Sequence, residues 1–187
     1  MGEPNDALVG PGFGLKKFSD DGLLHEDGYA LTLGCAMGDS IFLAQLGYVV
    51  DAVGNKMARE DVKQGGLLIN FYFGDVSAFD VSPDTYDVIV ANDALPMIED
   101  KGVVARVMKK MVDGLASGGL FYFMLLAQQN ALEEGRPRSF FGWEEALQLV
   151  AGLPLRMHYS VSEEGRSPAL AGGSKEYSVY HFLYVKE

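Results

Sequence analysis

Apolar and polar residues alternate along this chain in short segments that end at glycine. The apolar residues 29–33 lead into a glycine-containing turn at residues 34–38, and a second apolar run follows at residues 49–53. Between the turn and the second run lies a helix-like segment that Asp39 and Ser40 can cap. Strand, glycine turn, helix and strand in this order form half of a nucleotide-binding α/β unit.

The same alternation continues to the end of the chain. After the first two strands, further strands are expected at residues 67–73, 86–91, 120–126, 155–161 and 177–185. Helices are expected at residues 15–24, 39–46, 56–63, 99–116 and 143–150. The helix at 99–116 has the clearest pattern, because its apolar residues recur every three or four positions and form one stripe.

The remaining segments are expected to be irregular. Residues 1–14 form a lead-in, residues 117–119 (Ser-Gly-Gly) separate a helix from a strand, and residues 128–138 form a loop. Residues 162–175, rich in Gly, Ser and Glu, are expected to be a long exposed connection between the last two strands. Because no helix-length pattern separates those strands, they should be antiparallel. The prediction is one α/β domain, residues 1–187, with a mostly parallel sheet, helices on both faces and an antiparallel C-terminal strand.

The composition is that of an ordinary globular protein, with 48% apolar and 22% charged residues. The net charge of −11 repels phosphate backbones, so we expect a small-molecule substrate and no nucleic acid. No apolar run approaches the roughly 20 residues that cross a bilayer, and the N-terminus lacks a signal-peptide pattern. The single cysteine, Cys35, cannot form an internal disulfide, which fits a cytoplasmic location. The oligomeric state stays open.

The topology brings several turns to one edge of the sheet. In an open α/β sheet, ligands bind at the carboxyl ends of the strands, where the strand order switches. That edge collects residues 34–38, 54–55, 74–76 and 91–93. Glycines let a ligand approach the backbone, and the amides at a helix start favour a negative group. Asp75 can accept a hydrogen bond from an exocyclic amine.

These stretches resemble the class I S-adenosylmethionine (SAM) methyltransferases. The family's first two motifs are similar to LTLGCAMGDSIFLAQLGYVVDAV, and its third and fourth are similar to GDVSAFDVSPDTYDVIVAND. The glycine pair that leads into the family's fifth strand is similar to LASGGLFYFMLL. The small tellurite-resistance-type methyltransferases have elements similar to FGLKKFSDDGLL before the first strand and to HFLYVKE at the end. The motif order matches from about Gly14 to the end of the chain.

The resemblance implies a Rossmann-like methyltransferase fold, SAM as cofactor, and a role for each matching position. Thr32, Gly34, Cys35, Ala36 and Gly38 would surround the methionine portion, Gly54 and Asn55 the ribose, Asp75 and Val76 the adenine, and Asn92 and Asp93 the methyl group and the substrate.

Three positions depart from the family's pattern. The family usually has an acidic residue at position 32, glycine at 36, and Asp or Glu at 54, where this chain has Thr32, Ala36 and Gly54. The two carboxylates would hold the cofactor's amino group and its ribose hydroxyls. A charge-assisted hydrogen bond contributes about 1.5–3 kcal/mol and a neutral one about 1 kcal/mol. Losing both carboxylates is therefore expected to weaken binding about 100-fold or more, since Asn55 offers only a neutral acceptor.

Three functions follow. The first is in-line methyl transfer from SAM to a small molecule, with no general base assigned. The second is a catalytically silent binding module that keeps the fold and has lost part of the SAM site. The third, a nicotinamide-dependent oxidoreductase, is disfavoured, because Ala36 and Asp39 stand where its fingerprint has glycines and Gly54 stands where it has the ribose acid.

Several of these residues also have a purely structural interpretation. Gly34 and Gly38 can simply permit a tight turn, and Asp75 and Asp93 can cap loops. The three histidines lack metal-ligand spacing, so no metal site is expected and each is interpreted as a packed or surface residue; they are His25, His158 and His181.

Overall fold

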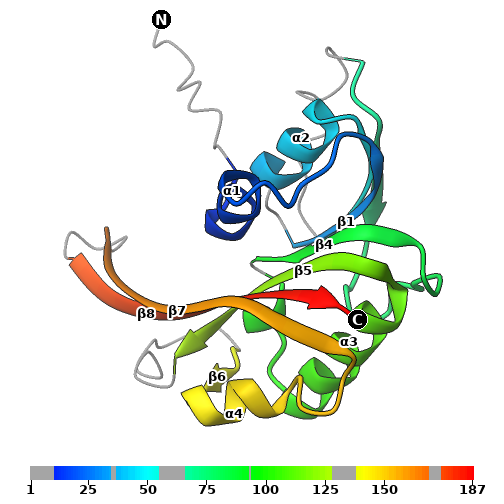
Figure 1. The fold of residues 1–187 in the computed structure, drawn as a ribbon. Coiled ribbons are helices and arrows are strands. Elements are labelled where there is room, and N and C mark those ends of the chain that lie inside the picture. The colour runs from blue at the N-terminus through cyan, green and yellow to red at the C-terminus, as the bar shows by residue number, and fades with distance from the viewer. Residues whose placement is uncertain (1–10, 35–36, 55–65, 93, 128–137, 169–173) are drawn as a thin grey trace, which may run out of the picture.

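The computed structural model describes residues 11–34, 37–54, 66–92, 94–127, 138–168 and 174–187. Its strands are β1 Gly28–Leu33, β2 Tyr48–Gly54, β3 Ile69–Phe73, β4 Tyr86–Ala91, β5 Leu115–Ala127, β6 Phe140–Phe141, β7 Leu155–Pro168 and β8 Ser174–Lys186. They form one sheet in the order β3-β2-β1-β4-β5-β8-β7, with β6 paired to β5 (Figure 1). Every pairing is parallel except those of β8 with β5 and β7. The predicted mostly parallel sheet with a reversed C-terminal strand is confirmed.

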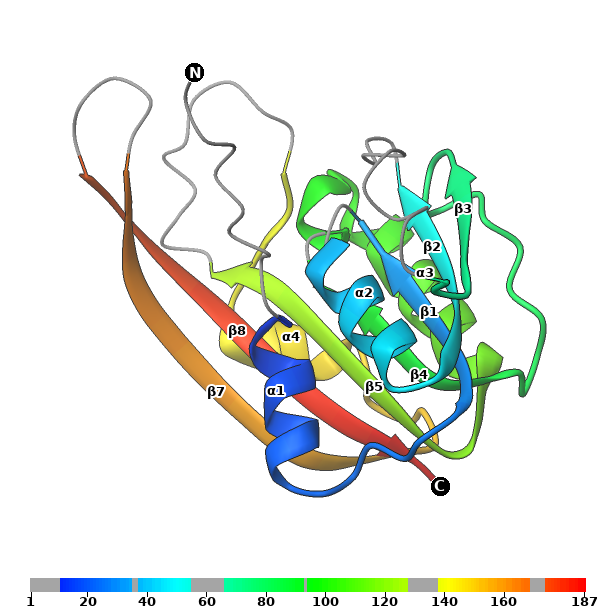
Figure 2. The same cartoon turned by 90° about the horizontal axis from the view of Figure 1, so that it is seen from above.

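Helices cover both faces of this sheet, as predicted. They are α1 Phe13–Asp20, α2 Met37–Gln45, α3 Lys101–Gly114 and α4 Trp143–Gln148, with a 3-10 turn at Leu95–Met97. Figures 1 and 2 show α1 and α2 on one face and α3 and α4 on the other. Each helix in the described part of the chain is too short or too polar to span a membrane.

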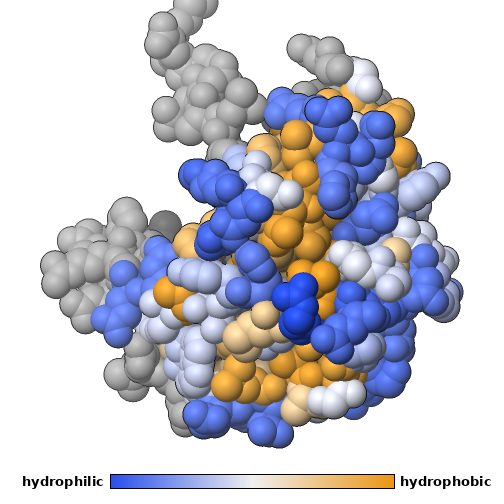
Figure 3. Space-filling model, in the orientation of Figure 1, coloured by the Kyte–Doolittle hydropathy of each residue, from blue (hydrophilic) through white to orange (hydrophobic). Residues whose placement is uncertain are grey.

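The side chains of β5 alternate between two separate hydrophobic cores. Phe121 and Phe123 point into the larger core, under α3 and α4, whereas Tyr122 belongs to the core under α1 and α2. All three rings are fully buried. Burying a side chain of this size contributes about 1.5–3 kcal/mol, so β5 anchors both layers. Part of the apolar surface remains visible beside α1 (Figure 3).

The chain passes from α3 into β5 earlier than its sequence predicts. Helix α3 starts after Asp100, whose carboxylate caps the amides of Gly102 and Val103. It ends at residue 114, and β5 begins at once, so the predicted break at residues 117–119 lies inside a strand. There the register with β4 shifts, and Gly118 takes a φ of +78°. The Ser-Gly-Gly stretch is thus a bulge, which satisfies the backbone without ending the strand.

The predicted bounds of two irregular segments are wrong. Residues 162–175 are not one long connection, because β7 continues to Pro168 and β8 starts at Ser174 (Figure 2). Their backbones pair as far as Pro168 with Ser174, and such a ladder does not require apolar side chains. The lead-in at residues 1–14 is also too long, since Phe13 and Gly14 open α1. The helix expected at residues 56–63 lies outside the described residues.

Candidate functional site

The strand order reverses between β1 and β4, and the carboxyl ends of these two strands mark the candidate site. The chain runs from β1 outward to β2 and β3, then returns to the other side of β1 as β4. Gly34 follows β1 and Asn92 follows β4, so both predicted positions lie at this edge. Of the other predicted residues, Cys35, Ala36, Asn55 and Asp93 lie outside the described residues.

Gly34 and Gly54 form a tight backbone contact at this edge. Gly34 has a φ of +103°, a left-handed conformation that favours glycine, and its amide donates to the Val53 carbonyl at 2.8 Å. A Cβ added to Gly54 would overlap the Gly34 carbonyl oxygen. The position where the family has its ribose carboxylate therefore has no room for a side chain along the direction that a Cβ would take.

Thr32 is buried and makes a hydrogen bond within the protein. The residue is 3% exposed, and its hydroxyl shares a hydrogen bond of 2.7 Å with Ser40. Ser40 therefore links α2 to β1 from inside the helix. The sequence interpretation of Ser40 and Asp39 as caps is wrong, because α2 already begins at Met37.

Asp39 is a buried carboxylate that the sequence interpretation did not place in the site. It is 1% exposed and accepts a hydrogen bond from the Gly12 amide at 2.6 Å. The Asn92 amide nitrogen donates to its other oxygen over 3.4 Å. Asp39 thus joins the segment before α1, the first turn of α2 and the end of β4. A buried carboxylate needs donors around it, and this one receives them from two other segments of the chain.

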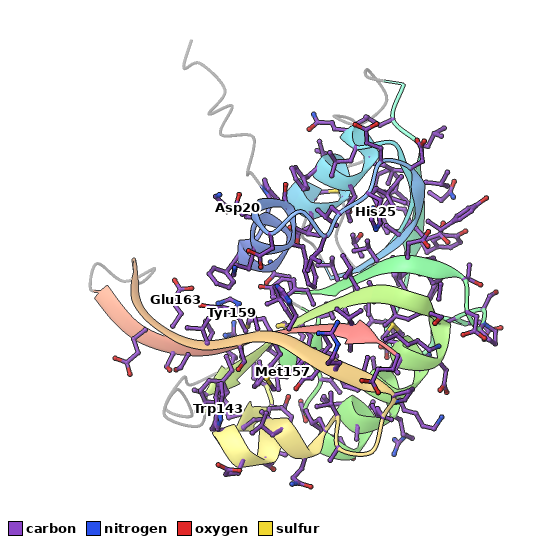
Figure 4. All side chains as sticks on the ribbon, viewed as in Figure 1. Asp20, His25, Trp143, Met157, Tyr159 and Glu163 are labelled. Carbon is purple, nitrogen blue, oxygen red and sulfur yellow. The ribbon has the colours of Figure 1, made fainter. Side chains whose placement is uncertain are left out.

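A chain of hydrogen bonds leads from Asn92 away from the edge. The Tyr122 hydroxyl lies 3.1 Å from the Asn92 amide oxygen and 2.9 Å from His181 Nδ1. His181 Nε2 lies 3.2 Å from a Glu163 carboxylate oxygen. Burial lowers the pKa of His181 below its ordinary 6.5, and the Glu163 carboxylate opposes that shift. Figure 4 shows Glu163 on the α1 side of the β7–β8 ribbon, whereas Trp143 lies on the α4 side.

Three consecutive residues at the start of α1 pack against this series of hydrogen-bonded side chains. The Gly12 amide binds Asp39, the Phe13 ring lies 4.7 Å from the His181 ring, and a Cβ at Gly14 would overlap the Tyr122 ring. The two glycines allow α1 to lie this close. The resemblance pointed to this segment as an element of the fold, but nothing in its sequence indicated that it covers polar residues.

The predicted adenine residues occupy a separate turn after β3. The exposed Asp75 accepts a hydrogen bond from the Ser77 amide at 2.8 Å, which is the loop-capping role weighed as its alternative. Val76 is half-buried against the larger core. Gly38 lies in the first turn of α2.

The described residues fit one part of SAM better than another. The Asp39 carboxylate and the Asn92 amide oxygen suit an ammonium group, and the Gly34 backbone allows close approach. The ribose hydroxyls find no carboxylate at position 54, because that position has no room for one. Among the described residues, no group of three or more His, Cys, Asp or Glu is arranged to hold a metal ion.

No protein-family model matches this chain, and no curated protein matches it significantly. Several solved structures, however, are similar to this chain. TehB from Haemophilus influenzae is 18% identical with a TM-score of 0.74, covering 92% of this chain and 62% of TehB. A SAM-dependent methyltransferase from Methanosarcina mazei is 17% identical with a TM-score of 0.68, covering 90% and 96% of the two chains.

A third similar structure holds ligands. It is the 1,6-didemethyltoxoflavin-N1-methyltransferase of Burkholderia thailandensis, with 1,6-didemethyltoxoflavin and S-adenosylhomocysteine bound; it is 16% identical with a TM-score of 0.65, covering 92% and 76% of the two chains. At such low identities the likeness concerns the fold. The strand order, the reversed strand β8 and these neighbours together show that the chain has the fold of the class I SAM-dependent methyltransferases.

Proposed function

We propose that this protein binds SAM at the carboxyl edge of β1 and β4 and transfers its methyl group to a small molecule. The observation that carries the proposal is the hydrogen bond between Asp39 and Asn92 at the edge where the strand order reverses, the edge at which Gly34 also lies. A similar structure with S-adenosylhomocysteine bound supports the choice of ligand. The net charge of −11 and the small-molecule substrate of that neighbour support the choice of acceptor class.

In this proposal Asp39 takes over the role of the acid that is missing at position 32. Its carboxylate and the Asn92 amide oxygen accept hydrogen bonds from the ammonium group of the methionine portion. Cys35, Ala36, Asn55, Asp75 and Val76 keep the roles that the resemblance implies. The ribose is held without a carboxylate at Gly54, so the affinity rests on the methionine end.

When bound, SAM supplies a methyl group activated by a neighbouring sulfonium. The protein's own part is then to hold the acceptor in line with that methyl group and to exclude water, and positioning alone can supply most of the rate. We assign no general base. We further propose that residues 1–187 act as one domain and that the protein is cytoplasmic, a location that its single cysteine supports.

Calorimetric titration with SAM, S-adenosylhomocysteine and NADH tests the proposal. We expect the first two ligands to bind and NADH not to bind. A ligand at 100 times its Kd should also stabilise the fold by about 2.7 kcal/mol. Absence of heat and of thermal shift at millimolar SAM would refute the cofactor. Binding without methyl transfer to a broad panel of small acceptors would instead favour the catalytically silent alternative.

A further inference from the structure

We propose that Gly12, the residue before α1, occupies the place of the ligand's ammonium group and must leave Asp39 before SAM can bind. The hydrogen bond from the Gly12 amide to the Asp39 carboxylate then keeps the site closed until a ligand competes for that carboxylate. The identity of the ligand rests on the proposed function, whereas the closing contact is a feature of the structure itself.

Gly12 covers both members of the Asp39–Asn92 pair. Its amide donates to one Asp39 oxygen at 2.6 Å. A Cβ added to Gly12 would lie 3.1 and 3.4 Å from the two Asp39 oxygens and 2.6 Å from the Asn92 amide nitrogen. The Gly12 backbone therefore lies directly over the two side chains that the proposed function assigns to the ammonium group.

A ligand cannot reach the Asp39 carboxylate in this arrangement. Asp39 is 1% exposed, and each of its two oxygens faces a donor from the protein, the Gly12 amide on one side and the Asn92 amide nitrogen on the other. For Asp39 to accept from an ammonium group, one of these two donors has to move away.

Gly12 is held less firmly by the rest of the fold than Asn92. Asn92 directly follows β4, whose last four residues are buried. Gly12 stands before the first turn of α1, where Phe13 is still 38% exposed. Leu15 and Phe18, further along the helix, are fully buried and anchor it. The chain can therefore open at Gly12 while the body of α1 stays packed.

An ammonium group is a stronger partner for a carboxylate than a backbone amide is. The Gly12 amide is a neutral donor, whereas an ammonium group has three N–H donors and a full positive charge. When Gly12 moves out, its amide can donate to water, so no buried donor is left unpaired. Only the open fraction of the molecules binds the ligand, and the closed contact lowers the apparent affinity accordingly.

Gly12→Pro tests the competition. Gly12 has a φ of −60° and a ψ of 164°, which proline adopts without strain, but the proline ring removes the N–H and fills the space beside Asp39. In calorimetry, we expect S-adenosylhomocysteine, which has the same ammonium group as SAM, to bind about tenfold more tightly to Gly12→Pro than to the wild type.

Gly102→Pro is the matched control. The Gly102 amide donates to the Asp100 carboxylate at the same distance, 2.6 Å, in the first turn of α3, so its loss should leave the affinity for S-adenosylhomocysteine unchanged. An affinity of Gly12→Pro equal to or below that of the wild type would overturn the inference and leave the proposed function standing. Binding to neither protein would overturn both.

Amide exchange in the full-length wild-type protein tests the same contact without a substitution. Saturating S-adenosylhomocysteine should release the Gly12 amide from Asp39, shift its proton signal upfield and raise its exchange rate at least about tenfold. The Gly102 amide, on Asp100, should keep both its shift and its rate. A Gly12 amide that stays protected in the saturated complex would overturn the inference, even if the ligand binds.

Discussion

Gly54 at the end of β2 packs against the carbonyl oxygen of Gly34 at the end of β1, with no space for a Cβ between them. The close packing of this edge thus explains why position 54 carries no ribose-binding acid. The edge has been closed by backbone contact at the place where the family's acid would begin.

Restoring an acid at that place should fail. In Gly54→Asp the new Cβ must displace a backbone carbonyl, so we expect a loss of about 1–3 kcal/mol in the free energy of unfolding and no gain in SAM affinity. Gly74→Asp is the matched control, because a Cβ at Gly74 meets no other atom within 4 Å. Urea denaturation and calorimetry provide the two readouts. Tighter SAM binding by Gly54→Asp would contradict the packing argument.

Asp39→Asn tests the buried carboxylate. The substitution keeps the shape but turns an N–H toward a donor, either the Gly12 amide or the Asn92 amide nitrogen. We expect a loss of about 1–3 kcal/mol in stability and at least about tenfold weaker SAM binding. Asp20→Asn, which alters an exposed pair with Lys16, is the control for the charge change. An unchanged SAM affinity in a folded Asp39→Asn would exclude Asp39 from the site.

Gly14→Ala tests the close approach of α1 to Tyr122. In an ordinary helix this change stabilises by about 0.5–1 kcal/mol. Here the added Cβ overlaps a fully buried ring, so we expect destabilisation of about 1–3 kcal/mol instead. Ser19→Ala on the exposed side of the same helix is the comparison. A stabilised Gly14→Ala would show that α1 does not rest on the Tyr122 ring.

The pH dependence of stability follows from His181. Folding lowers its pKa below 6.5, so the unfolded chain binds its proton first. Stability is therefore fully present above 6.5 and falls as the pH drops through the folded-state pKa. Urea midpoints measured across this range should fall less steeply in His181→Gln. In Glu163→Gln the His181 pKa, followed by NMR, should drop further; a rise would contradict the assigned role of the carboxylate.

Asp100→Ala tests the start of α3. Its carboxylate accepts from the amides of Gly102 at 2.6 Å and Val103 at 3.1 Å, so its removal should cost about 1 kcal/mol. Asp113→Ala in the last turn of the same helix removes an exposed pair with Lys109 and should cost less. Equal losses in the two variants, measured by urea denaturation, would count against the cap.

The site was predictable only in part, and the reason lies in distance along the chain. The glycine turn after β1 and the polar residue after β4 are local features, and both lie at the expected edge. Asp39 resembled a helix cap, because the donors that surround it come from residues 12 and 92. His181 resembled a packed residue, because its partner Tyr122 lies 59 positions away.

The sequence by itself determined the main order of strands and helices and the reversal near the C-terminus, and it pointed to the edge of the sheet that holds the candidate site. These follow from local periodicity and from the few connections that a parallel sheet allows. The tertiary structure alone decided that a Cβ at position 54 meets the Gly34 carbonyl, that Asp39 bonds Asn92 at the candidate edge, and that His181 is linked to Asn92 through Tyr122. Those facts depend on contacts between residues far apart in sequence, which no local pattern encodes.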